Sequence, residues 1–145
     1  CGGIACVLQG CERTTFDIDI AISFEKENLK RFVDFVKKVN LKPRINEPVE
    51  SLMNEEKRKK WITEKNAFVY SLTDEYGILQ LDIFLQYPID YETLSKNANI
   101  FIIKDLEIKV SSKKDLIRAK ESISPLREKD LKDIQELKRL IDGQN

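Results

Sequence analysis

The hydrophobic positions along the chain follow two periods, one typical of strands and one typical of helices. Between residues 17 and 24 every second residue is apolar, which predicts a strand with Ile18, Ile20, Ile22 and Phe24 on one face. From residue 29 to residue 36 the apolar side chains recur at i, i+3, i+4 and i+7, which predicts an amphipathic helix. We expect this helix to end before Pro43.

The same patterns predict further elements along the chain. Residues 4–8 form a short apolar run that predicts a buried helix ending near Gly10, and residues 41–53 show no period. The remaining predictions are a charged helix over 54–65, strands over 67–72 and 78–85 joined by a turn at 74–77, a short helix over 91–98, and a hairpin over 100–103 and 107–110.

The last third of the chain is predicted to be helical. Ser112 and Asp115 have the spacing of a capping box, and a final helix after Pro125 has a predicted buried stripe of Leu131, Ile134, Leu137 and Ile141. Strands that alternate with helices predict an α/β or α+β fold with a sheet of four to six strands. We expect one domain over 1–145, with a core over 1–110 and a helical part over 111–145. Because Cys1-Gly2-Gly3 is not a translation start, we expect a strand and a helix upstream.

Composition narrows the chemistry. The chain has 145 residues, 25 Lys and Arg, 25 Asp and Glu, three Cys and no His. The lack of histidine excludes Ser-His-Asp and Cys-His nucleophilic catalysis, imidazole bases and His-ligated zinc. Zero net charge argues against general binding to nucleic acid or to a membrane surface. The cysteines match no metal-binding or disulfide pattern, and no apolar run is long enough to span a membrane, so we expect a cytoplasmic protein.

Asp17 and Asp19 are the most unusual local feature. Two residues apart on a strand, they lie on the same face, about 7 Å apart along the chain. Like charges this close repel each other unless a cation lies between them. The alternative is that this face of an edge strand is simply solvated.

A third carboxylate favours the interpretation that a cation binds here. Asp82 lies within an apolar predicted strand, where an aspartate is unfavourable unless it is paired or bound to a metal. If the two strands are neighbours, three carboxylates converge into an oxygen site suited to one or two Mg²⁺ ions and to substrate phosphates.

Gly2 and Gly3 precede the first predicted helix. A glycine pair lets the backbone approach a triphosphate, and the amide groups at the helix start point toward it. The pair therefore predicts a phosphate-binding turn. The evidence for this prediction is the spacing along the sequence between the glycines and the aspartates.

Together these residues resemble the nucleotidyltransferase superfamily that includes DNA polymerase β. The resemblance rests on Gly2-Gly3, the short helix, the strand Asp17-Ile18-Asp19-Ile20, and Asp82 on a later strand. The segment 13–19 is similar to small prokaryotic members, namely aminoglycoside nucleotidyltransferase-like proteins and toxins of toxin–antitoxin and abortive-infection systems. Segments 112–120 and 127–134 resemble their C-terminal helices.

The resemblance implies a mixed sheet flanked by helices, with C-terminal helices. Asp17, Asp19 and Asp82 would bind Mg²⁺ or Mn²⁺, and Asp82 would also help to deprotonate the attacking hydroxyl. Gly2 and Gly3 would hold the β- and γ-phosphates of a nucleoside triphosphate such as ATP. The implied reaction transfers a nucleoside monophosphate to a hydroxyl and releases pyrophosphate.

Several basic residues have two interpretations. Arg13 either neutralises phosphate charge or pairs with a surface acid, and Lys120 either reaches outward or contacts an anionic ligand or the carboxylates. We include both with Gly2 and Gly3 as predicted nucleotide-binding residues. Arg127 and Asp130 either pair with each other, which we favour, or contact the substrate directly. The run 57–61 is either a solvated face or a contact for a nucleic-acid acceptor such as a tRNA 3′ end.

The sequence thus predicts a metal-dependent nucleotidyltransferase of toxin–antitoxin or defence type. Its acceptor would be RNA or tRNA, a protein, or a small molecule, and a cognate antitoxin or toxin is a possible partner. The alternative is a non-catalytic module of the same fold that acts as an antitoxin or a nucleotide sensor. The presence of all three aspartates argues against this alternative.

Overall fold

A four-stranded sheet and a separate two-stranded hairpin carry the strands of the computed structural model, which describes residues 1–143. The chain divides into two compact units. The sheet unit is Phe16–Tyr87, and the terminal unit combines Cys1–Thr15 with the residues from Pro88 onward.

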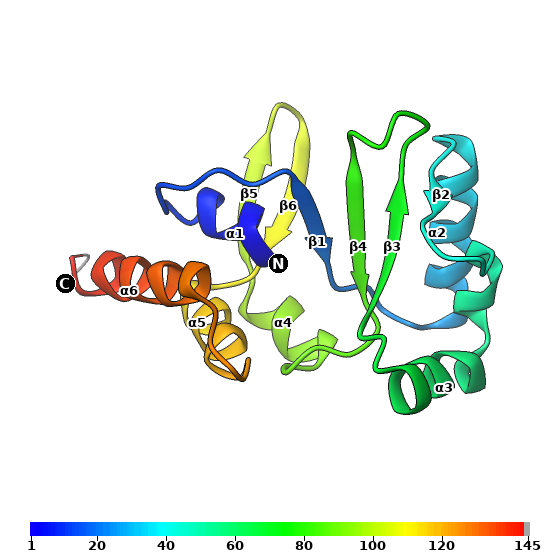
Figure 1. Cartoon of the computed structure of the whole chain (residues 1–145). Helices are drawn as coiled ribbons and strands as arrows, with labels where there is room; N and C mark the ends of the chain where they lie inside the picture. Colours follow the sequence, from blue (N-terminus) through cyan, green and yellow to red (C-terminus); the bar gives the residue numbers. More distant parts are fainter. Residues whose placement is uncertain (144–145) are drawn as a thin grey trace. The chain divides into compact units, whose positions relative to one another are not determined.

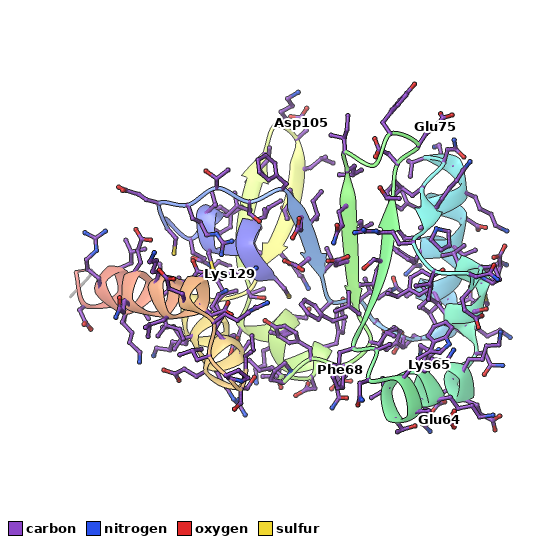
Figure 2. All side chains as sticks on the ribbon, in the orientation of Figure 1. Glu64, Lys65, Phe68, Glu75, Asp105 and Lys129 are labelled. Carbon is purple, nitrogen blue, oxygen red and sulfur yellow. The ribbon has the colours of Figure 1, made fainter. Side chains whose placement is uncertain are left out.

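The sheet unit contains a mixed sheet in the order β1-β4-β3-β2 (Figure 1). Its strands are β1 (Asp17–Ile20), β2 (Lys42–Pro43), β3 (Val69–Thr73) and β4 (Gln80–Phe84). The β1–β4 pair is parallel, whereas the β3–β4 and β2–β3 pairs are antiparallel. The turn between β3 and β4 carries Glu75, which Figure 2 labels.

One face of this sheet packs on the core of the unit. The helix α2 (Lys26–Lys38) contributes the predicted stripe of buried apolar residues, and η1 (Val49–Met53) and α3 (Glu55–Lys65) complete the cover. The sheet contributes the residues that alternate with the polar ones, such as Leu81 and Ile83. The opposite face of the sheet is therefore left for the polar side chains.

The terminal unit is built from helices and a hairpin. Its elements are α1 (Gly2–Leu8), α4 (Tyr91–Asn97), β5 (Asn99–Ile103), β6 (Leu106–Val110), α5 (Lys113–Glu121) and α6 (Glu128–Asp142). Its core joins α1, the end of β6 and the last two helices. Asp105, labelled in Figure 2, lies at the tip of the β5–β6 hairpin.

Most predicted elements are confirmed, including the capping of α5 by Ser112, whose side chain accepts a hydrogen bond from the Asp115 amide. The strand predicted over 17–24 ends at Ile20, because its only partner β4 pairs with it only up to Ile83. The boundary expected at residue 110 differs from the observed division, because α1 and β6 share a core with α5 and α6.

The predicted stripe of α6 is also partly wrong. Leu131 is 44% exposed, whereas Asp130 and Asp133 are buried on this helix. Among residues 1–143, no helix is both long and apolar enough to cross a membrane.

Candidate active site

The polar face of the sheet carries the three predicted carboxylates. Asp19 of β1 is the direct cross-strand partner of Asp82 of β4, and Asp17 lies on the same face two residues earlier. On the other side of β4, Ser71 is the partner of Asp82. The predicted adjacency of the two aspartate-bearing strands is thus confirmed.

The three carboxylates are not equally close to one another. Directly paired strands are about 4.8 Å apart, whereas two residues along a strand span about 7 Å, so Asp19 and Asp82 are the closer pair. Within residues 1–143, no three Asp, Glu, Cys or His side chains are arranged to hold one metal ion. The structure therefore brings together two carboxylates, with Asp17 on their flank.

Asp82 has one oxygen in an unusual state. Its Oδ2 accepts a hydrogen bond from Gln80 Nε2 at 2.9 Å. Its Oδ1 is the one buried side-chain oxygen or nitrogen in the described part of the chain that has no hydrogen-bond partner. A buried carboxylate oxygen without a partner is unfavourable, and a bound ion or water is a common reason for it.

Two polar neighbours of Asp82 were not predicted. Gln80 lies two residues before Asp82 on the same face, and Arg44, directly after β2, donates from Nη1 to Gln80 Oε1 at 2.6 Å. Gln80 could have been found from its spacing to Asp82. Arg44 could not, because β2 has only two residues and lies in a stretch without periodicity.

The glycine pair lies in the terminal unit and has a packing role there. Gly2 has a φ of +61°, a backbone conformation that residues other than glycine rarely adopt. A Cβ on Gly3 would lie 2.6 Å from Thr15 Oγ1 and 3.1 Å from an Arg13 guanidinium nitrogen. Close packing within this unit thus explains Gly3, and its expected role in holding phosphates stays a prediction.

Arg13 and Lys120 both contact carboxylates of α6. Lys120 Nζ lies 3.0 Å from Asp130 Oδ1 and 2.7 Å from Asp133 Oδ2. Arg13 Nη1 lies 2.5 Å from Asp133 Oδ2, and Arg127 Nε lies 2.5 Å from Asp130 Oδ2, as expected for that pair. We call these five residues the ion network.

Charge pairing in the ion network outweighs burial. Burial alone lowers the pKa of Lys120, but hydrogen bonds to Asp133 and Asp130 raise it above its usual value. Burial alone raises the pKa of Asp130, but hydrogen bonds from Arg127 and Lys120 lower it below its usual value. Both groups therefore stay charged near neutral pH. The burial of Asp130 and Asp133 could not be predicted from the sequence, because they do not belong to an apolar stripe.

Two of the three cysteines, Cys6 and Cys11, are poor nucleophiles. Cys6 and Cys11 are buried, and burial raises the pKa of the Cys6 thiol to about 12. Burial also raises the pKa of Cys11. Because the thiolate is the reactive form, a raised pKa makes both thiols unreactive, and both side chains belong to the core of the terminal unit.

The basic run 57–61 is engaged in local structure. Trp61 is buried and stacks on Tyr70 with ring centroids 5.7 Å apart. Arg58 lies over the Phe24 ring and donates to the Leu52 carbonyl oxygen. The tryptophan is therefore not available to stack on a nucleic-acid base.

The expected Mg²⁺ or Mn²⁺ site stays a prediction. Mg²⁺ is commonly held by one or two carboxylates together with substrate phosphates and water, so Asp19 and Asp82 are the residues that would hold it. The unpartnered Asp82 Oδ1 is the atom that such an ion would satisfy.

Comparison with known proteins adds no relative. No protein-family model and no curated protein matches the chain.

Proposed function

We propose that this protein is a metal-dependent nucleotidyltransferase that moves a nucleoside monophosphate from a nucleoside triphosphate to a hydroxyl and releases pyrophosphate. The observation that carries the proposal is the cross-strand pair of Asp19 and Asp82, with the buried and unpartnered Oδ1 of Asp82. Two like charges on neighbouring strands repel each other, and a cation bound between them removes this repulsion. A divalent cation, Mg²⁺ or Mn²⁺, is the compensation that this oxygen chemistry favours.

In this proposal the carboxylates of Asp19 and Asp82 hold the cation, and Asp17 contributes from the flank. When bound, the cation neutralises phosphate charge and lowers the pKa of a coordinated hydroxyl. The acceptor oxygen forms a bond to the α-phosphorus while the bond between that phosphorus and the β-phosphate oxygen breaks. The electron pair leaves with pyrophosphate, and the acceptor proton passes to a carboxylate, for which Asp82 is the candidate, and then to water.

The donor and the acceptor are proposed only as classes of molecule. The donor is a nucleoside triphosphate such as ATP, and Gly2, Gly3, Arg13 and Lys120 remain predicted nucleotide-binding residues. RNA, a protein or a small molecule is the acceptor, and a toxin–antitoxin or defence role with a cognate partner follows from the resemblance. The RNA hypothesis loses the base contact expected from Trp61, because this side chain is buried.

A labelled-transfer assay tests the proposal. The protein is incubated with each nucleoside triphosphate carrying a radioactive α-phosphate, with Mg²⁺ or Mn²⁺, and with total RNA, total protein or a panel of aminoglycosides. We expect label in one acceptor class and its loss in Asp19→Asn and Asp82→Asn. Asp34→Asn on the exposed face of α2 is the matched control and should keep the activity. Equal labelling in all variants would contradict the proposal.

One observation favours a second candidate, a non-catalytic module of the same kind that senses nucleotides or binds a partner protein. Among residues 1–143, no three potential ligands are arranged around one ion, as a preformed two-metal site would require. The two candidates differ in one result. The sensor binds a nucleoside triphosphate without releasing pyrophosphate, whatever acceptor is supplied.

A further inference from the structure

The orientation of Asp82 depends on a hydrogen-bonded chain of three side chains on the polar face. Gln80 and Asp82 are two residues apart on β4, so their side chains share a face. Gln80 Nε2 donates to Asp82 Oδ2 at 2.9 Å, and Arg44 Nη1 donates to Gln80 Oε1 at 2.6 Å. We refer to these three residues as the Arg44–Gln80–Asp82 relay.

Arg44 fixes which way the Gln80 amide faces. A guanidinium group has donors only, so the atom of Gln80 that meets it must be the carbonyl oxygen. The amide nitrogen of Gln80 then faces Asp82 and has a carboxylate as its acceptor. The backbone amide of Arg44 donates to the Ser71 carbonyl oxygen at 3.0 Å, which anchors this arginine beside β3.

The relay leaves the two oxygens of Asp82 in different states. Oδ2 is occupied by Gln80, and Oδ1 is buried and without a hydrogen-bond partner. A carboxylate held by one oxygen cannot rotate freely, so the other oxygen stays in one place. Outer partners of this kind orient metal ligands in many proteins, and their loss weakens metal binding.

We propose that Gln80 and Arg44 are positioning residues that hold Asp82 with Oδ1 presented to the divalent cation. This inference rests on the proposed function, because it assumes that Asp82 is a metal ligand. It extends the proposed function by giving two residues outside the carboxylate set a defined role. Neither residue touches the cation or the substrate in this account.

The sign of the effect of Arg44 separates this proposal from simple electrostatics. Arg44 carries a positive charge on the same sheet as three carboxylates, so Coulomb's law alone says that its removal strengthens cation binding. The relay predicts the opposite: removal of Arg44 weakens cation binding, because the Gln80 amide and hence Asp82 are then free to move. Lys42, one position before Pro43 on β2, provides a matched loss of charge without a side-chain contact to Gln80.

The experiment measures Mn²⁺ alone, by the loss of the free-ion signal in electron paramagnetic resonance. The variants are Gln80→Met, Arg44→Met, the double variant, Lys42→Met and Asp82→Asn, each with its melting temperature. We expect the Mn²⁺ Kd to rise about 10-fold in Gln80→Met, at the lower end of the usual range for outer partners, and less in Arg44→Met. The double variant should match Gln80→Met, because Arg44 acts through Gln80. Lys42→Met should leave the Kd unchanged or lower it.

The remaining outcomes overturn one claim or both. If Arg44→Met binds Mn²⁺ as tightly as Lys42→Met or more tightly, while Asp82→Asn loses binding, the relay is wrong and the metal site stands. If the wild-type protein binds no Mn²⁺, the metal site is wrong and the positioning role is wrong with it. Because Arg44 is an exposed side chain, Arg44→Met decides the question even if Gln80→Met does not fold.

Discussion

Lys120 Nζ lies 2.7 Å from Asp133 Oδ2, and both side chains are almost fully withdrawn from solvent. The same ammonium group contacts Asp130, so one cation from α5 serves two carboxylates of α6. Removing one partner of a buried ion pair leaves an uncompensated charge. We therefore expect the stability of the terminal unit to be sensitive to the loss of any one member of the ion network.

Lys120→Met should destabilise the protein by about 3–5 kcal/mol, because it leaves the carboxylates of Asp130 and Asp133 without their shared partner. Urea unfolding measures the change. Lys132→Met on the exposed side of α6 is the matched control, because its pair with Glu128 is solvent-exposed and should contribute less than about 1 kcal/mol. Equal effects in the two variants would contradict a structural role of the buried network.

The ion network also predicts how stability depends on pH. The lowered pKa of Asp130 makes a contribution that is present above its unfolded-state pKa of about 3.9 and is lost as pH falls through its folded-state pKa. The raised pKa of Lys120 makes a contribution that is present below about pH 10.4 and is lost as pH rises through its folded-state pKa.

The free energy of unfolding should therefore fall below about pH 4 and again above about pH 10.4. Urea unfolding across the pH range measures both limbs. Asp130→Asn should be less stable at neutral pH and should lose less stability than the wild type on acidification. An acid limb of the same size in this variant would show that Asp130 does not contribute to it.

Gly3→Ala should destabilise the protein by about 1–3 kcal/mol, because the added Cβ would lie 2.6 Å from Thr15 Oγ1. Thr15→Ala in the same chain removes that oxygen and should restore part of the loss. Thermal unfolding of the single and double variants measures this. An unchanged melting temperature in Gly3→Ala would mean that Gly3 is not required for packing, and would leave its phosphate-binding prediction as the only reason for the glycine.

Trp61→Ala should destabilise the sheet unit by about 3–5 kcal/mol, because this side chain is 4% exposed and stacks on Tyr70. Lys60→Ala on the same helix should have almost no effect on stability. Tryptophan fluorescence of the wild type should be that of a buried indole. Emission typical of a solvated indole would reopen the acceptor hypothesis for residues 57–61.

The sequence predicted the local elements well because their signals are local. The apolar stripe of α2, the cap of α5 and the turn between β3 and β4 each depend on a few neighbouring residues. The pairing of β1 with β4 was inferred from chemistry, because a shared cation would explain the aspartates of both strands if the strands were neighbours.

The features that the sequence did not predict depend on long-range contacts. Arg44 reaches Gln80 only because the two-residue strand β2 pairs with β3. Asp130 and Asp133 face the core because Lys120 meets them from another helix. Trp61 belongs to the core although its helix has no clear apolar stripe. Local periodicity contains no information about such partners.

The central claim is that Asp19 and Asp82 hold a divalent cation for a nucleoside triphosphate. The most direct test is the melting temperature of the wild type and of Asp19→Asn with each nucleoside triphosphate, with and without Mg²⁺. Each variant needs its own ligand-free baseline, because removing one of two repelling carboxylates can itself stabilise the sheet. The account predicts a rise that requires both Mg²⁺ and a nucleotide and is lost in Asp19→Asn. A rise that is equal in both proteins, or none with any nucleotide, would contradict it.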